Sequence, residues 1–291
     1  MTDATTRVLH DVTIIVVSYN SAHCLPALGR LLAACPNVAV VDNASQDGTA
    51  AAVARHLPQA RLVELDRNHG FGAANNVALR EVRTPFALLL NPDCEITTTA
   101  IAGLIDAACV HPDAAIVAPQ LVRPPDGQVD INYRWPRTMW TSRGGGAEGP
   151  VCVGFVCGAA MLLRIAAFEG VGFFDEDYFL YYEDDDLCLR LFTARRPMLV
   201  VPHITALHRS RGSVRGAHPW HSEYVRGYHH AQSKLTFARK HRSPGHARAQ
   251  RRRLLWTTAL ALPLRVLLFS PKLAARMLGR LRGLIEWRFH D

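Results

Sequence analysis

The sequence predicts an α/β fold, with a mostly parallel sheet flanked by helices and a helical, basic C-terminal extension. The chain has 291 residues, 49% of them apolar and 20% charged, so it has the composition of a globular protein that can bury a full core. Short apolar segments alternate with amphipathic ones as far as about residue 120, and several apolar segments end on polar residues. This alternation is typical of a sheet that helices cover on both faces.

The first apolar segment, residues 12–17, consists of β-branched residues, as expected of a buried parallel strand. The same criteria predict further strands at 38–41, 61–65, 85–90, 115–120, 155–163 and 198–201, and one ending at 208. Helices are predicted at about 22–34, 45–57, 68–82, 98–110 and 219–241, and from 183 onward. Residues 134–150, which include three consecutive glycines, are expected to form a long loop.

Polar side chains follow the ends of several predicted strands. In sheets of this kind, ligands bind beyond the carboxyl ends of the strands. We therefore expect one binding site that draws on several strand ends. The residues concerned are Ser18, Tyr19, Asn20, Asp42, Asn43, Asn68, Asn91 and Asp93.

The segment from Gly70 to Asn75, Gly-Phe-Gly-Ala-Ala-Asn, imitates a dinucleotide-binding fingerprint. Asn75 stands where the third glycine would be, and the segment follows the third predicted strand instead of the first, so NAD binding is not favoured. Gly70 instead indicates a close approach of the backbone to a phosphate or a sugar at the start of a helix.

Residues 174–190 carry seven carboxylates within twelve residues, interleaved with aromatic side chains. Carboxylates this close repel one another, and burying them is costly unless a cation compensates. Acids at 183–186 and bases further on suit a helix dipole, so one interpretation is a solvated first helical turn. The apolar run 178–182 is expected to be a strand that brings the acids to a buried rim. That arrangement favours a site for a metal, a base, or both.

Asp93 and His208 are the candidate metal ligands. An acid after a buried strand can hold a divalent cation through its oxygens, with phosphates completing the coordination shell. A single histidine is more often structural than a ligand, but in the same cleft as Asp93 it becomes a candidate. The seven cysteines form no Cys-x-x-Cys pair, and residues 1–11 contain no apolar signal, which together indicate a cytoplasmic protein with reduced thiols.

The net charge of +8 is concentrated at the C-terminus. From Arg239 onward there are thirteen Lys and Arg against two acids, a charge of +11, whereas the remainder has 20 basic and 23 acidic residues, a charge of −3. Because the excess is local and no base-stacking motif accompanies it, nucleic-acid binding is not expected. The apolar run 254–269 is too short and too interrupted to span a membrane.

Beyond that run, apolar residues of the tail form one helical stripe with arginines elsewhere on the turn. The stripe consists of Met277, Leu278, Leu281, Leu284 and Ile285. A basic amphipathic tail can lie on a peripheral, anionic membrane surface. The alternative is an ordinary helix that packs on the domain and exposes its basic face.

In combination, several segments resemble the inverting GT-A glycosyltransferases of family 2, in particular their bacterial rhamnosyltransferase-like branch. The resemblance covers roughly residues 12–210. It is carried by IIVVSYNS (14–21), VVDNASQDGT (40–49), NHGFGAANN (68–76), LLLNPDCEI (88–96) and GAAMLLRIAAFEGVGFFDEDYFLYYEDDDLCLRL (158–191).

The resemblance implies a GT-A fold that binds a nucleotide-diphosphate sugar. Asp42 would meet the pyrimidine base, with the turn 18–20 along the nucleotide. Asp93 would hold Mg²⁺ or Mn²⁺ against the pyrophosphate, with His208 as a further ligand. Asp184 would be the general base. The full donor-binding set is Ser18, Tyr19, Asn20, Asp42, Asn68, Gly70 and Asn91, and Glu183 and Asp185 are expected to support the acceptor.

Asn91 departs from the family's usual metal motif, which begins with Asp, although this branch commonly has Asn-Pro-Asp. The implied organisation is a catalytic domain over residues 1–240 and a basic amphipathic extension over 241–291. The implied reaction moves a sugar, with rhamnose suggested by the branch, to a hydroxyl of a cell-surface glycan or a lipid-linked acceptor. It would take place in the cytoplasm, at the inner face of the cell membrane.

Two other functions remain as alternatives. A sugar nucleotidyltransferase would share the sheet, but should open with a glycine-rich loop followed by Arg and Lys, where this chain has Ser18-Tyr-Asn-Ser. A non-catalytic scaffold for polysaccharide assembly would not need Asp93, Asp184 and His208 together.

Overall fold

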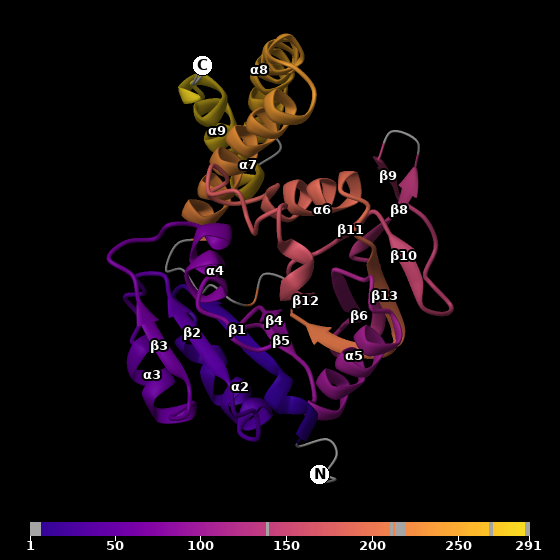
Figure 1. Ribbon diagram of the computed structural model, residues 1–291. Coiled ribbons are helices and arrows are strands. Elements are labelled where there is room, and N and C mark those ends of the chain that lie inside the picture. Colours follow the sequence, from indigo (N-terminus) through magenta and orange to yellow (C-terminus); the bar gives the residue numbers. More distant parts are fainter. Residues whose placement is uncertain (1–6, 138–139, 210–211, 213–218, 268–269, 289–291) are drawn as a thin grey trace. The chain divides into compact units, whose positions relative to one another are not determined.

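The computed structural model describes residues 7–137, 140–209, 212, 219–267 and 270–288 (Figure 1). Contacts within the chain group it into two compact units. The first comprises Met1–His69, Ala73–Phe174 and Leu187–Arg215, and the second comprises Gly70–Gly72, Asp175–Asp186 and Gly216–Asp291. Two of the points at which the chain passes from one unit to the other lie within helices, namely α4 (Phe71–Leu79) and α6 (Glu183–Thr193). The predicted boundary between residues 240 and 241 falls inside the second unit.

The first unit is built on a large mixed sheet. Its strands follow the order β10-β13-β6-β12-β4-β1-β2-β3, with β5 paired to β13 and β7 paired to β6. The strands are β1 (Val12–Ser18), β2 (Val38–Asp42), β3 (Arg61–Glu64), β4 (Phe86–Leu90), β5 (Cys94–Glu95), β6 (Ile116–Arg123), β7 (Gln128–Asp130), β10 (Val151–Val153), β12 (Ala160–Arg164) and β13 (Met198–His208). From β4 through β1 and β2 to β3 the strands run parallel, as the alternation predicted.

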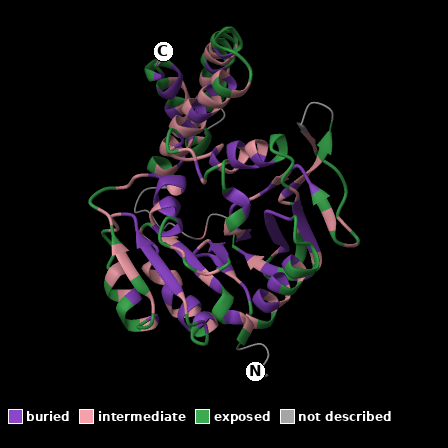
Figure 2. Cartoon of the chain, in the orientation of Figure 1, coloured by how far each residue is buried: buried purple, intermediate pink, exposed green. Residues whose placement is uncertain are grey.

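The parallel strands end together, which fixes where a ligand site can form. Ser18, the last residue of β1, pairs with Asp42, the last residue of β2. Strands β1 and β2 each consist of a largely buried apolar run that stops at a polar residue, and Figure 2 shows them buried along most of their length. The predicted alignment of polar strand ends is therefore confirmed for these two strands.

Helices α2 (Leu25–Leu32), α3 (Thr49–His56) and α5 (Thr98–Val110) pack on the sheet. One core cluster joins alternate residues of the strands, such as Ile14 and Val16, to apolar residues of these three helices. Alternation follows from the period of two in a strand, which points every second side chain to one face. Short 3₁₀ helices are η1 (Leu9–Asp11), η2 (Ala22–Cys24) and η3 (Ile165–Phe168).

The segment 134–150, predicted as a long loop, contains strands. β8 (Tyr133–Arg137) pairs with β9 (Trp140–Ser142) and with β11 (Phe155–Val156) in a separate small sheet. The aromatic and β-branched residues of this segment favour strands. The three glycines, which favour a loop, lie beyond β9. Residues 138 and 139 of the predicted loop lie outside the described residues.

The second unit contains three long helices, α7 (Pro219–His241), α8 (Pro244–Leu267) and α9 (Pro271–Glu286). Glycines bring α7 and α9 into close contact. A Cβ added at Gly227, Gly279 or Gly283 would lie 2.0, 1.9 or 2.4 Å from a carbonyl oxygen of the facing helix, so only glycine fits there. A small core lies between the helices and consists of Ala231, Leu235, Ala238, Ala247, Leu284 and Trp287, with Leu254 and Leu255 packed against it.

The aromatic run 178–182, predicted as a strand, forms turns instead. Tyr181 and Tyr182 have φ angles of 69° and 68°, in the left-handed region that interrupts an extended strand. Within the second unit this run packs on α7: the Phe179 ring stacks on His229, with centroids 4.1 Å apart, and Ser233 Oγ donates to the carbonyl of Leu180 at 2.9 Å. Side-chain contacts with the helix therefore outweigh the strand preference of aromatic residues.

Candidate active site

The loops that follow β1 and β2 are bound to each other by hydrogen bonds. The amide of Asn20 donates to Ser45 Oγ at 2.8 Å, and the amide of Gln46 donates to Asn20 Oδ1 at 2.8 Å. Asn20 has a φ of 51°, a conformation that Asn tolerates better than most residues. The amide of Ala22 donates to Asp47 Oδ2 at 3.0 Å. These bonds hold the two strand ends as one rigid edge.

Ser18 and Asp42 lie at the centre of this edge and are buried. Asp42 Oδ1 accepts a hydrogen bond from the amide of Ser45 at 3.1 Å. The Oγ atom of Ser18 is buried and has no hydrogen-bond partner within the described part of the chain. A buried hydroxyl without a partner is unfavourable, so it is the kind of group that a bound ligand or water can satisfy. Tyr19, beside it, is exposed.

Asn43 connects a third loop to this edge. Its Nδ2 donates to Asn68 Oδ1 at 2.9 Å, and its Oδ1 accepts from the amide of His69 at 2.9 Å. Asn68 thus lies beside the ends of β1 and β2, as predicted from its place after the third strand. The sequence predicts Asn43 as a strand-end residue, but the predicted donor-binding set does not contain it. Its amide makes it the residue that positions Asn68.

The two predicted metal ligands lie side by side. Asp93 follows β4, and its Oδ1 lies 3.6 Å from Nε2 of His208, the last residue of β13. Both side chains are buried, and β5 pairs with β13 so that Cys94 is opposite His208. The strand pairing therefore brings together two residues more than one hundred positions apart in sequence. Asn91 lies just before them, with its amide bonded to the carbonyl of Ala159 at 2.9 Å.

Gly212 connects this pair to the loop after β1. Its amide donates to Asp93 Oδ2 at 2.8 Å, and its carbonyl lies 2.7 Å from His23 Nε2. The predicted donor-binding and metal-binding residues of the first unit thus share one hydrogen-bonded neighbourhood. No sequence pattern predicts the roles of His23 and Gly212, since Gly212 acts through backbone atoms and His23 bonds to a backbone carbonyl.

Asp93 and His208 fit a divalent cation that also binds phosphates. Among the described residues, no group of three or more His, Cys, Asp or Glu side chains is arranged to hold a metal. A closed site made only of protein ligands is therefore not present there. Mg²⁺ is commonly held by one or two carboxylates plus substrate phosphates, and Asp93 supplies one such carboxylate. The donor set thus fits a metal that arrives with a phosphorylated substrate.

Gly70 belongs to the second unit, and its φ is +88°. A Cβ at this position would lie 2.2 Å from the carbonyl oxygen of Phe179, and the amide of Phe71 donates to that same oxygen at 3.1 Å. The close backbone approach predicted for Gly70 is thus made to the segment before the acids. This contact explains the glycine without a ligand, and the role of Gly70 in donor binding stays a prediction.

The four acids at the start of α6 differ in their surroundings. Glu183 and Asp186 are buried, whereas Asp184 and Asp185 are only half-buried. The amide of Asp185 donates to Asp184 Oδ1 at 3.1 Å. Since positions three apart lie on one side of a helix, the first and last acids face inward and the middle two remain accessible. The helix start itself is confirmed.

Asp186 contacts two basic side chains from the end of α7. Its Oδ1 lies 2.7 Å from Lys240 Nζ and 2.7 Å from His241 Nε2, and Lys240 also pairs with Asp175. This group explains how one carboxylate of the cluster can be fully buried, because a buried charge needs opposite charge and hydrogen bonds. Asp186 therefore anchors the start of α6 within the second unit.

Burial raises the pKa of Glu183 well above its usual value of 4.5, and the neighbouring charges of Asp184 and Asp185 raise it further. Its Oε2 is buried and has no hydrogen-bond partner in the described chain. A carboxyl group whose pKa is raised on folding binds its proton more tightly in the folded state. Stability is thus lost as pH rises from the unfolded pKa through the folded one.

We expect Glu183→Gln to be more stable than the wild type at neutral pH and equally stable below about pH 4, because glutamine cannot ionise. Urea unfolding measured across this pH range tests the difference. The exposed Glu169→Gln is the matched control and should follow the wild type throughout. A gain for Glu183→Gln that does not grow with pH would contradict the assignment of Glu183 as a protonated side chain.

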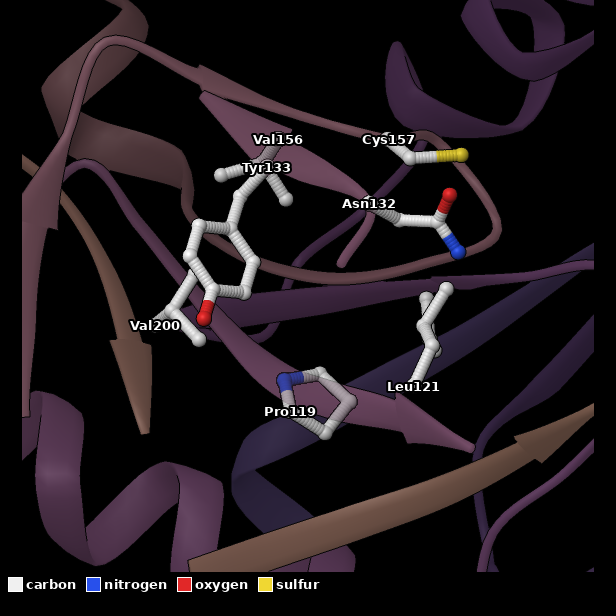
Figure 3. Close-up of a pocket in the computed structure, with 8 residues that line it drawn as sticks. Pro119, Leu121, Asn132, Tyr133, Val156, Cys157 and Val200 are labelled. Atoms are coloured by element: carbon white, nitrogen blue, oxygen red, sulfur yellow. The ribbon is translucent and has the colours of Figure 1, made fainter. Parts of the chain in front are cut away.

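Two hollows of the first unit lie apart from this edge. A cavity of about 10 Å³ lies between the two sheets and can hold about one water molecule; Figure 3 shows residues that line it. Asn132 Nδ2, which lines it, is buried without a hydrogen-bond partner in the described chain, so a water fits there. A wider hollow of about 300 Å³ lies near Thr13, Val38 and Arg61, at the amino ends of the parallel strands. Neither is at the ligand-binding ends of the strands.

Solved structures that share this fold are glycosyltransferases. The mannosyltransferase PcManGT from Pyrobaculum calidifontis, solved with GDP-Man and Mn²⁺, matches with a TM-score of 0.57 over 94% of this chain and 86% of its own, at 18% identity. GalNAc-T7, solved with UDP, GalNAc and Mn²⁺, matches with a TM-score of 0.55 over 78% of this chain and 51% of its own, at 11% identity. The fold is therefore the GT-A fold of this class of enzyme, as the resemblance implied.

The chain belongs to the family described as Glycosyl transferase family 2, whose model matches residues 13–172. An N-acetylglucosaminyl-diphospho-decaprenol L-rhamnosyltransferase of Mycobacterium tuberculosis is 31% identical over 94% of this chain and 98% of the relative. The hexosyltransferase Agl10 of low-salt glycan biosynthesis in Haloferax volcanii is 26% identical over 62% of each chain. The protein is thus a glycosyltransferase, and its similarity to the rhamnosyltransferase covers almost its full length.

Proposed function

We propose that this glycosyltransferase moves rhamnose from a nucleoside diphosphate to a hydroxyl group of a lipid-linked glycan acceptor. The observation that carries the proposal is the similarity to the M. tuberculosis L-rhamnosyltransferase over nearly the whole of both chains. The acceptor class that we propose is the one in that relative's name, an N-acetylglucosaminyl diphosphate on a polyprenol. Such an acceptor is held in a membrane, and the basic tail of this chain suits an anionic membrane surface.

The strand-end residues of the first unit are proposed to bind the donor. Asp42, buried at the end of β2, would recognise the base, and the loop 18–20 would lie along the nucleotide. Ser18 supports this role, because its buried hydroxyl has no hydrogen-bond partner in the described chain. Asn68 and Asn91 flank the same edge through their bonds to Asn43 and Ala159. These contacts make the edge rigid, which lowers the entropic cost of binding a nucleotide.

Asp184 is proposed as the general base. In an inverting transfer, the oxygen of the acceptor hydroxyl attacks the anomeric carbon while the bond from that carbon to the diphosphate oxygen breaks. The proton of the hydroxyl goes to the Asp184 carboxylate. The surroundings of the four acids support this choice, because Glu183 and Asp186 are buried and Asp186 contacts Lys240 and His241, whereas Asp184 is only half-buried. Asp185, also half-buried, is proposed to support the acceptor.

Mg²⁺ or Mn²⁺ is the proposed cofactor, held by Asp93 and His208. When bound, the cation would neutralise the negative charge that develops on the leaving diphosphate. The protein's part is to hold the two ligands in place. Gly212 holds Asp93 through the hydrogen bond that its amide donates to the carboxylate. The pairing of β5 with β13 holds His208.

We expect Asp93→Ala to lose most of the metal-dependent affinity for a nucleoside diphosphate. Removal of the carboxylate leaves His208 as a lone neutral ligand, which is weak for a hard cation. Calorimetric titration with the nucleoside diphosphate, with Mn²⁺ or with a chelator, measures the difference. Asp113→Ala, at an exposed acid of the same unit, is the control and should bind as the wild type. Equal affinity with and without metal in the wild type would contradict the metal proposal.

The proposed reaction is tested with a panel of nucleoside diphosphate sugars that differ in base and in sugar. A short-chain prenyl diphosphate carrying N-acetylglucosamine serves as the acceptor. We expect release of nucleoside diphosphate and a glycosylated lipid with a rhamnose donor only. Equal transfer from another sugar would overturn the assignment of rhamnose. Absence of nucleoside diphosphate release with every donor would instead favour a scaffold.

A further inference from the structure

Helix α8 has two apolar faces, and only one of them is used inside the second unit. Leu254 and Leu255 pack against the small core that contains Leu235 and Leu284, and Thr258 is buried on the same side. The opposite side is exposed. Its apolar side chains are Trp256, Leu260, Leu264 and Leu267, which are 72%, 74%, 55% and 72% exposed.

These four side chains, here called the outer stripe, lie on one side of the helix. Successive members are four, four and three residues apart, which is the spacing of one helical face. Figure 2 shows exposed residues along the length of α8. An ordinary surface helix carries polar residues on the face turned away from its core. A continuous apolar stripe there indicates a partner that covers it.

The charges around the outer stripe identify the kind of partner. Helix α8 contains five arginines and no Asp or Glu. Arg251 is engaged within the unit, where its guanidinium donates to the carbonyls of Leu284 and Ile285. Arg252, Arg253 and Arg265, in contrast, are exposed. The surface that covers the stripe should therefore be anionic.

A second copy of this chain does not suit the stripe. Two copies packed stripe to stripe would bring exposed arginines of α8 together with no carboxylate on either helix to offset them. A membrane also cannot be crossed by this element, since no helix among the described residues is long and apolar enough to span one. A helix that is apolar on one side, rich in Arg and has Trp at the boundary suits the plane of a bilayer surface.

We propose that the outer stripe of α8 inserts into the surface of an anionic bilayer, with Arg252 and Arg253 among the lipid headgroups. This inference deepens the proposed function, since it rests on an acceptor held in a membrane, and it names the surface that approaches the lipid. In the stripe predicted from sequence on the last helix, Leu278 and Ile285 are 48% and 58% exposed, and a role of these two at the same surface stays a prediction. Leu284 of that stripe is fully buried, and the glycines beside it face α7.

The test uses the full chain with Trp256, Leu260 and Leu264 all replaced by Gln. Removal of residues 251–291 would be a poor test, because Leu284 and Trp287 belong to the core of the unit. Vesicles of phosphatidylcholine, with and without phosphatidylglycerol, are sedimented with the protein at low and high salt, with no substrate present. We expect binding of the wild type to the anionic vesicles only, and weaker binding at high salt.

The triple variant should bind the anionic vesicles more weakly than the wild type. Each replaced leucine should lower the affinity by at least about tenfold, because its side chain is no longer partly buried in the bilayer. Arg252→Gln should weaken binding about fivefold. Val110→Gln, at an exposed apolar residue of α5, is the matched control and should bind as the wild type. Circular dichroism of each variant should be unchanged, since the substituted side chains are exposed.

Wild-type binding of the triple variant would overturn the inference, as would equal binding of the wild type to neutral and anionic vesicles. A wild type that dimerises without vesicles, and a triple variant that is monomeric, would assign the stripe to a second copy instead. The nucleotide-sugar panel, run with the short-chain acceptor in solution, separates this inference from the proposed function. If the triple variant transfers the sugar but does not bind vesicles, the proposed reaction and the docking surface are both supported. If the wild type binds vesicles but transfers no sugar, the docking surface stands and the proposed reaction is overturned.

Discussion

Asp184→Asn is expected to lower the rate of sugar transfer by about 10²–10⁴-fold, the typical loss when a general base is removed. Asparagine has nearly the same shape as aspartate, and its side-chain oxygen can still accept from the amide of Asp185, as Asp184 Oδ1 does at 3.1 Å. The start of α6 should therefore stay folded, and affinity for the donor should stay close to that of the wild type. Single-turnover transfer and calorimetric binding of the nucleoside diphosphate measure the two effects separately.

Two variants of the same acidic segment serve as references for Asp184→Asn. Asp177→Asn replaces an exposed acid and should leave transfer unchanged. Glu183→Gln replaces a buried carboxyl group whose pKa burial raises well above its usual value, so most of the activity should remain. Transfer by Asp184→Asn at the wild-type rate would move the general base to another residue, with Asp185 as the next candidate.

Gly279→Ala is expected to destabilise the second unit by about 1–3 kcal/mol, the usual cost of forcing an extra carbon into a filled contact. The new Cβ would lie 1.9 Å from the carbonyl oxygen of Tyr224, and neither atom belongs to a flexible side chain. Alanine favours a helix over glycine by only about 1 kcal/mol, which does not offset such an overlap. Helix α9 must shift away from α7. Urea unfolding followed by circular dichroism measures the loss.

Gly245→Ala, near the start of α8, is the matched control. A Cβ there would have Ser243 Oγ at 3.9 Å as its nearest neighbour, which is ordinary contact. This variant should be as stable as the wild type or slightly more stable. A Gly279→Ala protein with unchanged stability would show that α7 and α9 can separate without cost, and would contradict the close packing of their glycines.

Much of the fold could be predicted from the sequence, because a buried parallel strand is a short apolar run and few other elements resemble it. The predicted helices 98–110 and 219–241 agree with α5 and α7 to the residue. Two predictions were wrong: the loop predicted at 134–150 contains strands of the small sheet, and the strand predicted at 178–182 does not form. In both, contacts with distant parts of the chain decide the outcome, and a local pattern does not contain them.

The candidate site was predicted unevenly for the same reason. Asp93 and His208 could be paired from sequence, because Asp93 follows a strand, His208 ends one, and strand ends converge. The separate roles of the four acids of α6 could not be distinguished, because what separates them is burial and the bases at the end of α7. Asp186 has its partners 54 and 55 positions further along the chain, and no local pattern connects them.

The partners of Asp186 also set the order in which the protein matures on the ribosome. The residues that match the family, 13–172, and all four acids leave the ribosome before Lys240 and His241 are made. Until then, the nascent chain lacks the two basic side chains that Asp186 contacts from the end of α7, so the start of α6 is without those contacts. A product of premature termination before residue 240 would keep the large sheet and lack an ordered base. We therefore expect a chain that ends before Lys240 to lack transfer activity.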